Sequence, residues 1–274
     1  MPLNKKQQEE LKAKVDQRVI LVTGASGGIG EGIVRSAYEH QFCKRFVLVA
    51  RREEELKRVA ASLPDADCLI VTADVTKEED VKRVGEKALE HFGRVDVWVN
   101  NAGKGSTVKP SELQAHHIDE MIDVNVKSVL YGMHVALNIF KTNAAQEGGQ
   151  IVNVSSLLAR AMQVYPERDT SFRSAYGPSK AFVTAMTDAF RTELNTDAAW
   201  KDKIKISTVN PGPVGSDFGV NANGPPSAGQ SVESCADAIY QLTLLEQRDE
   251  MYTDPPLYPA VNAYYERLLA APEE

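Results

Sequence analysis

The sequence is poor in several features that mark specialised classes of protein. It has three cysteines in 274 residues and no Cys-x-x-Cys pair, which argues against a disulfide framework and a thiolate metal site. Basic residues are outnumbered, with 31 lysines and arginines against 38 aspartates and glutamates and a net charge of −7. This balance disfavours nonspecific attraction to nucleic acid or to an anionic membrane. We therefore expect a reduced, cytoplasmic protein without a nucleic-acid partner.

Long hydrophobic runs are missing too. The longest uncharged, mostly apolar stretch, residues 128–140, is too short to cross a bilayer and is typical of a buried helix face. Residues 1–17 mix lysines and glutamates without an apolar core, which predicts a polar extension and no secretory signal. Hydrophobic residues at 43% and charged residues at 25% are ordinary globular values. We expect one domain over residues 18–274 and no membrane anchor.

Short apolar runs rich in β-branched residues alternate with longer amphipathic segments. The runs predict strands at residues 19–22, 46–50, 68–72, 95–100, 151–155 and 204–210. The segments between them predict helices at residues 30–40, 53–63, 78–92, 112–143 and 174–196. Such alternation implies right-handed crossovers and an α/β fold, a Rossmann-like doubly wound parallel sheet with helices on both faces. Ligands in this fold bind beyond the carboxyl ends of the strands.

A glycine-rich segment, residues 23–30 (TGASGGIG), joins the first predicted strand to the first helix. Glycines there permit a tight turn, let the backbone approach a pyrophosphate, and aim the N–H groups of the helix at that anion. A plain glycine-rich turn is the alternative, but the placement favours dinucleotide binding. The chain has no Gly-x-x-x-x-Gly-Lys-Ser/Thr sequence, so a nucleotide triphosphatase is not expected.

Arg51 and Arg52 follow the second predicted strand, where NAD enzymes usually place an acidic residue for the adenosine ribose. A guanidinium binds a phosphate bidentately, so the pair predicts NADP, with its 2′-phosphate. Two solvated surface arginines are the alternative.

Tyr176 and Lys180 stand four residues apart at the start of a predicted helix, and therefore on one helix face. A positive charge near the phenol favours the phenolate and lowers its pKa from about 10, which suits proton transfer. Tyr176 is thus the expected acid/base. A packed tyrosine beside a solvated lysine is the alternative.

Together these motifs resemble the short-chain dehydrogenase/reductase family in its compact single-domain form, from Val19 to about Asp217. The resemblance completes a catalytic tetrad in chain order: Asn125, Ser156, Tyr176 and Lys180. It implies that Ser156, rather than Ser155, donates to the substrate carbonyl oxygen. It also implies that Lys180 binds the nicotinamide ribose and that Asn125 holds a water that relays the proton.

The same resemblance implies a set of cofactor-binding residues in the loops that follow the strands. These are Gly24, Ser26, Gly28, Ile29, Gly30, Arg51, Arg52, Asp74, Val75, Asn101, Ala102, Gly103, Tyr176, Lys180, Pro211, Gly212, Val214 and Ser216. Asp74 has an alternative role as a helix cap, and the asparagine-glycine and proline-glycine segments have one as plain turns.

Two segments near the expected site lack a clear counterpart. Residues 157–175 are longer than is usual in the family, and either shape the substrate pocket or form a solvated loop. Residues 217–231 are rich in glycine and proline and predict a mobile loop, consistent with a lid over substrate.

The sequence thus predicts an NADPH-dependent reductase of ketones or aldehydes, acting on a small carbonyl or alcohol substrate. The alternatives are an NAD-dependent alcohol or hydroxysteroid dehydrogenase and a non-catalytic dinucleotide sensor. No metal is expected, since the adjacent His116 and His117 point in different directions on a helix. The resemblance favours a homodimer or homotetramer. An apolar stripe fits either subunit packing or core packing: Val129, Met133, Ala136, Leu137 and Phe140.

Overall fold

The computed structural model describes residues 17–143, 148–160, 171–221, 229–245, 247–254 and 266. Within these ranges seven strands form one parallel sheet in the order β3-β2-β1-β4-β5-β6-β7. The strands are β1 (Val19–Thr23), β2 (Arg45–Ala50), β3 (Asp67–Thr72), β4 (Val97–Asn100), β5 (Gly149–Val154), β6 (Ile204–Asn210) and β7 (Glu250–Tyr252). The strand order reverses between β1 and β4, the switch point at which doubly wound sheets bind their ligands.

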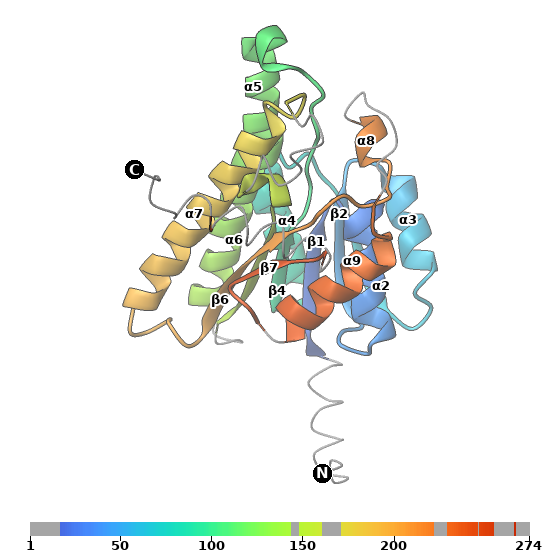
Figure 1. The fold of residues 1–274 in the computed structure, drawn as a ribbon. Coiled ribbons are helices and arrows are strands. Elements are labelled where there is room, and N and C mark those ends of the chain that lie inside the picture. The colour runs from blue at the N-terminus through green and yellow to red at the C-terminus, as the bar shows by residue number, and fades with distance from the viewer. Residues whose placement is uncertain are drawn as a thin grey trace.

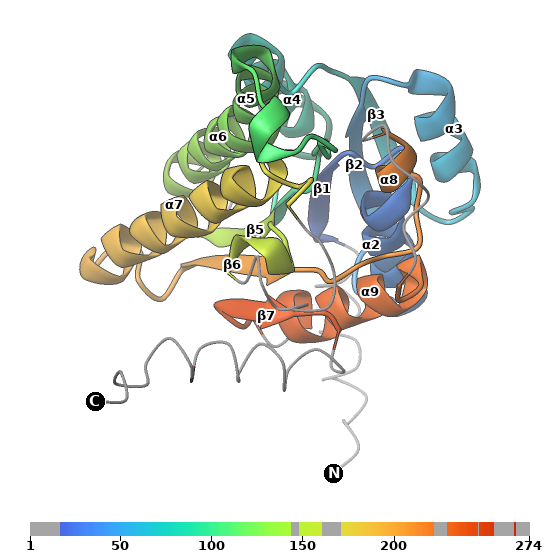
Figure 2. The same ribbon diagram turned by 45° about the horizontal axis from the view of Figure 1, so that its top comes forward.

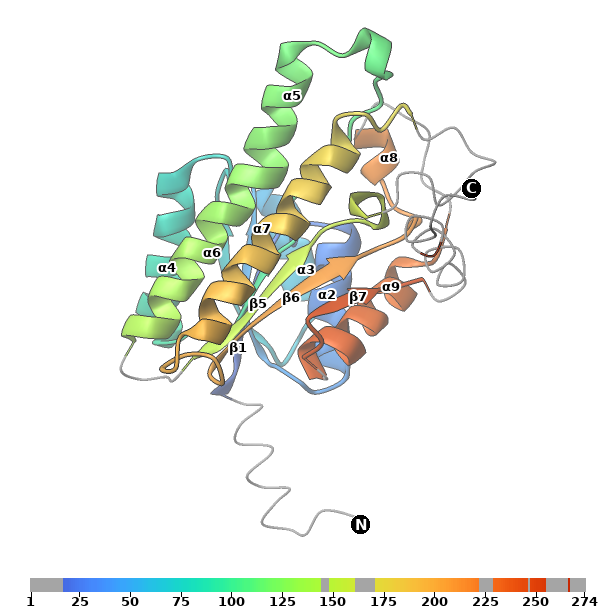
Figure 3. The same ribbon diagram turned by 60° about the vertical axis from the view of Figure 1, so that its left-hand side comes forward.

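Helices cover both faces of the sheet (Figures 1, 2 and 3). One face carries α2 (Gly28–Glu39), α3 (Glu53–Ala61) and α9 (Val232–Ile239), and the other carries α4 (Glu78–Phe92), α6 (Ser128–Thr142) and α7 (Tyr176–Thr196). The short helices α5 (Ala115–Met121) and α8 (Phe218–Asn221) lie beyond the ends of the strands, at the top of Figure 1. The expected fold, a Rossmann-like doubly wound sheet, is confirmed.

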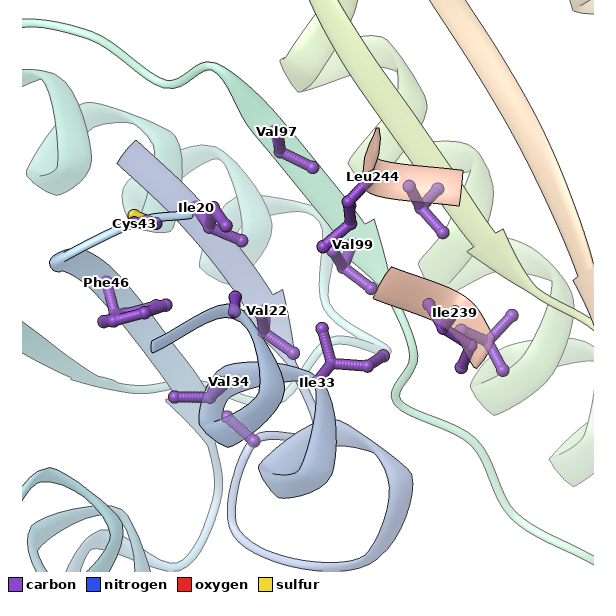
Figure 4. Packing of buried hydrophobic residues seen from close by; sticks show 14 of the residues in the cluster. Ile20, Val22, Ile33, Val34, Cys43, Phe46, Val97, Val99, Ile239 and Leu244 are labelled. Carbon is purple, nitrogen blue, oxygen red and sulfur yellow. The ribbon is translucent and has the colours of Figure 1, made fainter. Parts of the chain in front are cut away.

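The sheet is buried because its strands are apolar on both sides. Ile20 and Val22 of β1 pack with Ile33 and Val34 of α2 (Figure 4), while the alternate residues of β1 pack against the opposite helical layer. Each such side chain contributes roughly 1.5–3 kcal/mol when it is fully buried. This continuous burial on two faces fixes the register of the strands and, through it, the position of every loop at their carboxyl ends.

The apolar stripe on α6 belongs to the core. Val129, Met133, Ala136 and Phe140 are all buried against the sheet, and Leu137 packs partly against the same cluster. Packing within one chain therefore accounts for the stripe, which carries no argument for subunit contact.

Three features of the fold differ from the expectations. Strand β7 and helix α9 were not predicted. β7 has only three residues, Glu-Met-Tyr, and α9 has eight, so neither is long enough to show a clear periodic pattern in the sequence. The single helix expected at residues 112–143 is instead interrupted. A 3-10 turn at Pro110–Glu112 precedes α5, and a π-helical segment at Ile122–Lys127 joins α5 to α6.

Some expectations fall outside the described residues. These are the N-terminal extension up to residue 16, residues 161–170 of the long segment before Tyr176, and residues 222–228 of the loop after β6. Among the described helices, none is long and apolar enough to cross a membrane.

Candidate active site

The loop between β1 and α2 needs glycine for its shape. Gly24 and Gly28 have φ angles of +69° and +55°, in the left-handed region that favours glycine. A Cβ atom at Gly30 would lie 2.3 Å from the carbonyl oxygen of Gly24, so the turn has no room for a side chain there. The loop leads directly into α2, whose N-cap, Gly27, has no side chain to occupy the first N–H groups. This geometry leaves the helix N-terminus open to an anion.

Asn101 ties the glycine loop to the end of β4. Its Nδ2 donates to the carbonyl oxygen of Thr23 (2.9 Å), and the Thr23 hydroxyl accepts from the backbone N–H groups of Asn101 (3.0 Å) and Ala102 (3.1 Å). Asn101 and Ala102 therefore hold the glycine loop against the end of β4.

Arg52 lies over the glycine loop. Its Nη2 donates to the Ser26 hydroxyl (3.1 Å) and lies 3.7 Å from where a Cβ atom of Gly27 would be. A larger residue at position 27 would crowd this guanidinium. Arg51 is exposed. The two arginines expected to share one role thus differ in position, and Arg52 is the one in contact with the loop.

Asp74 shapes the start of α4. Its carboxylate accepts from the backbone N–H (3.1 Å) and the hydroxyl (2.8 Å) of Thr76, and its own N–H donates to Asp80 (2.8 Å). These bonds form a turn before α4, whose N-cap is Lys77 without a side-chain cap, so Asp74 does not fill the alternative role of a helix cap. Val75 is partly buried against the core. Contact of this pair with adenine stays a prediction.

Tyr176 is the first residue of α7, and its side chain is buried. Burial raises the pKa of its phenol above the ordinary value, while a hydrogen bond with the Ser156 hydroxyl and the positive charge of Arg173 act in the opposite direction. The ring of Phe218 on α8 packs against it, with 5.4 Å between ring centroids. The phenol therefore keeps its proton in surroundings that are largely apolar.

Lys180 does not lower the pKa of Tyr176 as its position on the helix predicted. Its Nζ donates to the carbonyl oxygen of Val154 (2.9 Å) and lies 6.0 Å from the centre of the Tyr176 ring. Desolvation lowers the pKa of Lys180 itself to about 8. The net pKa of Tyr176 is raised because the loss of hydration exceeds the effect of the neighbouring charges.

The two serines after β5 have different partners. The Ser155 hydroxyl bonds to the Lys180 carbonyl oxygen (2.9 Å) and to the Thr184 hydroxyl (2.8 Å), which fastens the strand to α7. The Ser156 hydroxyl accepts from the backbone N–H of Leu158 (3.2 Å) and bonds with Tyr176. The geometry thus favours Ser156 as the serine that faces the reacting group.

Asn125 sits in the π-helical segment, fully buried. Its Oδ1 accepts from the N–H of Lys104 and its Nδ2 donates to the carbonyl oxygen of the same residue, both at 2.9 Å. The amide also donates to Ser179 (3.0 Å), whose hydroxyl donates to the Tyr176 carbonyl oxygen (2.7 Å). Asn125 therefore clamps the loop after β4 to the first turn of α7. Its link through Ser179 was not expected.

The turn after β6 lies beside the glycine loop. Ser216 Cβ is 3.8 Å from where a Cβ atom of Gly28 would be, and the Pro211 carbonyl oxygen accepts from the Leu157 N–H (2.9 Å). Val214 pairs with Gln230 on the far side of the following loop. Gly212 follows Pro211 in this turn.

Two residues at the site were missed by sequence reasoning. Phe218 covers Tyr176, and Arg173 places its charge close to the phenol while its Nη1 donates to the carbonyl oxygen of Ser106 (3.3 Å). Arg173 falls within the long segment of residues 157–175, for which the family resemblance offers no counterpart. Its only signal is a position three residues before Tyr176.

At the switch point, the backbone of Gly103 lies close to Asn125 and Lys180 and forms a cradle with them. A Cβ atom at Gly103 would lie 3.2 Å from Oδ1 of Asn125 and 3.4 Å from Nζ of Lys180, so any side chain there would fill the space between them. With the open glycine loop and Arg52, this fits a dinucleotide lying across the carboxyl ends of β1 and β4. In the described ranges no three His, Cys, Asp or Glu residues gather as a metal site would require.

Comparison with known proteins agrees with this geometry. A family model described as short chain dehydrogenase matches residues 18–225. An uncharacterized oxidoreductase of Staphylococcus epidermidis is 32% identical over 238 residues, covering 84% of this chain and 93% of the relative.

Two solved structures share the fold and differ in the coenzyme that they hold. The alcohol dehydrogenase of the archaeon Thermococcus sibiricus, complexed with 5-hydroxy-NADP, has a TM-score of 0.71 and 26% identity, over 86% of this chain and 95% of that one. The 3-ketoacyl-(acyl-carrier-protein) reductase of Brucella melitensis, complexed with NADH, has a TM-score of 0.73 and 27% identity, over 88% of this chain and 98% of that one. The chain therefore belongs to the short-chain dehydrogenase/reductase family and is an oxidoreductase of that family.

Proposed function

We propose that the protein is an NADPH-dependent reductase of ketones or aldehydes, with Tyr176 as the acid that protonates the carbonyl oxygen. The observation that carries this proposal is the convergence of Tyr176, Ser156 and Lys180 beside the cradle at Gly103. An acid, a hydrogen-bond donor and a cation at the mouth of a dinucleotide cleft are the groups that reduction of a carbonyl requires.

The bound nicotinamide would supply the hydride. Tyr176 would donate the proton from its hydroxyl to the carbonyl oxygen, while the Ser156 hydroxyl stabilises the charge that develops there. The buried, protonated phenol suits the direction of reduction, because the step needs its proton. Lys180 would bind the nicotinamide ribose, while the charge of Arg173 favours the phenolate left behind. Asn125, held by Lys104, would keep in place the water through which the proton is restored.

Arg52 supports the choice of NADPH over NADH. Its guanidinium lies against Ser26 and above the glycine loop, where it would meet a phosphate on the adenosine ribose. The solved relatives hold either coenzyme, so this choice rests on Arg52. An NAD-dependent alcohol or hydroxysteroid dehydrogenase is the alternative function.

The coenzyme choice predicts different effects for the two arginines. Arg52→Ala should raise the Kd for NADPH by roughly 10- to 100-fold, as expected for a lost charge-assisted bond, and leave that for NADH within about threefold. Arg51→Ala should have a smaller effect, because among the described residues it is Arg52, not Arg51, that bonds to the loop. Fluorescence titration of each variant with both coenzymes measures this. Equal losses for NADPH and NADH in the Arg52 variant would move the assignment to the NAD-dependent alternative.

The proposed reaction is tested by oxidation of NADPH and of NADH, in parallel, with aliphatic, aromatic, diketone, quinone and steroid carbonyls. Turnover that favours NADPH supports the proposal. Coenzyme binding without turnover of any carbonyl would instead favour a non-catalytic dinucleotide sensor.

A further inference from the structure

Arg173 is a partly buried arginine without a carboxylate partner among the described residues, unlike six other arginines of the chain. Ion pairs with aspartate or glutamate hold Arg35, Arg58, Arg83, Arg94, Arg160 and Arg191. Across the described ranges, Arg173 forms none; its Nη1 donates to the Ser106 carbonyl oxygen and its guanidinium lies 5.1 Å from the centre of the Phe172 ring. Among the described residues, most of the five N–H donors of this half-buried guanidinium have no partner, a costly arrangement that an anion would relieve.

The position of Arg173 is fixed by the backbone around it. Val108 N–H donates to the Phe172 carbonyl oxygen (2.8 Å), and the Ser174 hydroxyl donates to the Val108 carbonyl oxygen (2.6 Å). These bonds join the loop after β4 to the residues just before Tyr176. The guanidinium is therefore held beside the loop after β4, from where its charge acts on the phenol of Tyr176.

The remaining surroundings of Tyr176 are apolar. Met121 and Ala175 are buried with it, and Leu113, Leu158 and Phe218 pack against this cluster. Thr107, the residue after Ser106, has a buried hydroxyl group. It is one of four buried side-chain polar atoms for which the described part of the chain offers no hydrogen-bond partner. A ligand that met these groups would present carbon to the cluster and negative oxygen to Arg173.

We propose that Arg173 binds an anionic group of the substrate, so that the preferred substrate is an apolar carbonyl compound that carries a carboxylate. The inference rests on the proposed function, since it names the substrate class of that site. Arg173 acts here as a specificity-determining residue. Its guanidinium would hold the carboxylate while the carbonyl oxygen lies at Tyr176 and Ser156.

The test compares keto acids of increasing chain length with their methyl esters, which keep the carbon skeleton and remove the charge. The wild-type protein should show a kcat/KM at least about tenfold higher for the best acid than for its ester, as a charge-assisted bond predicts. Arg173→Gln should lower kcat/KM for the acid by roughly 10- to 100-fold, chiefly through KM, and change that for the ester less than about threefold. Arg173→Lys should recover part of the preference, because it keeps the charge but not the planar fork.

The ester separates substrate recognition from an effect on the phenol. Loss of the Arg173 charge also raises the pKa of Tyr176, but that change acts equally on the acid and the ester. Equal losses for both substrates in Arg173→Gln, or no preference for acids in the wild type, would overturn the inference. Arg83→Gln, which removes an arginine paired with Asp80 on α4, is the matched control and should leave the acid-to-ester ratio unchanged.

A binding measurement keeps this inference separate from the proposed reaction. Calorimetric titration of the NADPH-loaded protein with an aromatic carboxylate that has no carbonyl to reduce should show binding that Arg173→Gln weakens at least about tenfold. Such binding without turnover of any carbonyl would support the anion site and contradict the proposed reductase. Turnover of neutral ketones without this binding would support the proposed reductase and contradict the anion site.

Discussion

The hydroxyl of Tyr176 lies in surroundings that hold its proton, and Lys180 lies in surroundings that release one. Burial raises the pKa of the phenol and lowers that of the ammonium to about 8. The same desolvation acts in opposite directions because it disfavours the charged form of each group. In the absence of coenzyme, the site is therefore set for donation of a proton by Tyr176.

Tyr176→Phe removes the transferable proton and preserves the ring that Phe218 covers. We expect kcat/KM for carbonyl reduction to fall by at least about 100-fold, as is usual on loss of a general acid, while the Kd for coenzyme changes little. Steady-state kinetics and fluorescence titration measure the two quantities. Tyr38→Phe, on α2, is the matched control and should have normal activity. Normal turnover in the Tyr176 variant would remove it from the mechanism.

Lys180→Met should make the protein more stable as it abolishes activity. A lysine whose pKa falls from 10.5 to about 8 on folding opposes folding while both states are charged, below pH 8, and this cost vanishes as the pH rises through 10.5. Removing the charge should raise the free energy of unfolding at pH 7 by roughly 1–3 kcal/mol and have a much smaller effect near pH 10.5. Urea denaturation without coenzyme, at both values, measures it. A variant less stable than the wild type at pH 7 would show that the buried ammonium is well solvated.

At the scale of elements, most strands were predictable because a strand that is buried on both faces of the sheet consists of an uninterrupted run of apolar residues. The expected strand at residues 204–210 agrees with β6, and the helix at residues 78–92 agrees with α4. β7 was missed because it depends on pairing with β6, a long-range contact that three residues do not reveal. The π-helical segment was missed because it depends on the bonds between Asn125 and Lys104.

The candidate site was predictable only as far as chain order allowed. Tyr176 and Lys180 were found from their spacing, and Asn125 and Ser156 from the family resemblance. Which serine faces the phenol depends on how β5 meets α7, and the opposing effects on the Tyr176 pKa depend on burial. Arg173 approaches Tyr176 because a loop from a distant strand holds it there. Contacts between distant segments of the chain leave no local pattern in the sequence from which they could be predicted.

Gly132 sets the distance between α6 and the sheet. A Cβ atom there would lie 2.0 Å from Oδ1 of Asn100 and 2.8 Å from Nε1 of Trp98, two atoms joined by a buried hydrogen bond of 2.8 Å. Gly132→Ala should therefore lower the free energy of unfolding by roughly 1–3 kcal/mol, despite the better helix propensity of alanine. Chemical denaturation measures this. Asn138→Ala, on the exposed side of α6, should change stability by less than about 0.5 kcal/mol. If Gly132→Ala and Asn138→Ala changed the free energy of unfolding equally, α6 would have moved to accommodate the added methyl group without cost.

At the scale of the whole molecule, parallel topology brings loops from across the chain to one edge of the sheet. The glycine loop, Asn101, the Pro211 turn and the start of α7 meet there because each follows the carboxyl end of a strand or faces one. The fold class alone thus indicated where to find the site. It does not determine the substrate, which depends on side chains such as Arg173 and Phe218.

The family resemblance predicts a homodimer or homotetramer, and a substitution of Phe182 tests whether α7 takes part in the contact between subunits. Phe182 on α7 is 53% exposed, the more exposed of two large apolar side chains on the surface of the described chain. Light scattering should give a mass at least twice the 30.1 kDa of one chain, and Phe182→Glu should lower it. A wild-type mass of one chain would show that the exposed Phe182 has another role.

Transfer of deuterium tests the central claim most directly. The wild-type protein is given a carbonyl substrate that it reduces and NADPH deuterated at the hydride position of the nicotinamide, and the alcohol is examined by mass spectrometry and NMR. We predict one deuterium on the carbon of the former carbonyl, with no such product from Tyr176→Phe. Alcohol formed without deuterium at that carbon, or formed equally well by the Tyr176 variant, would contradict the account.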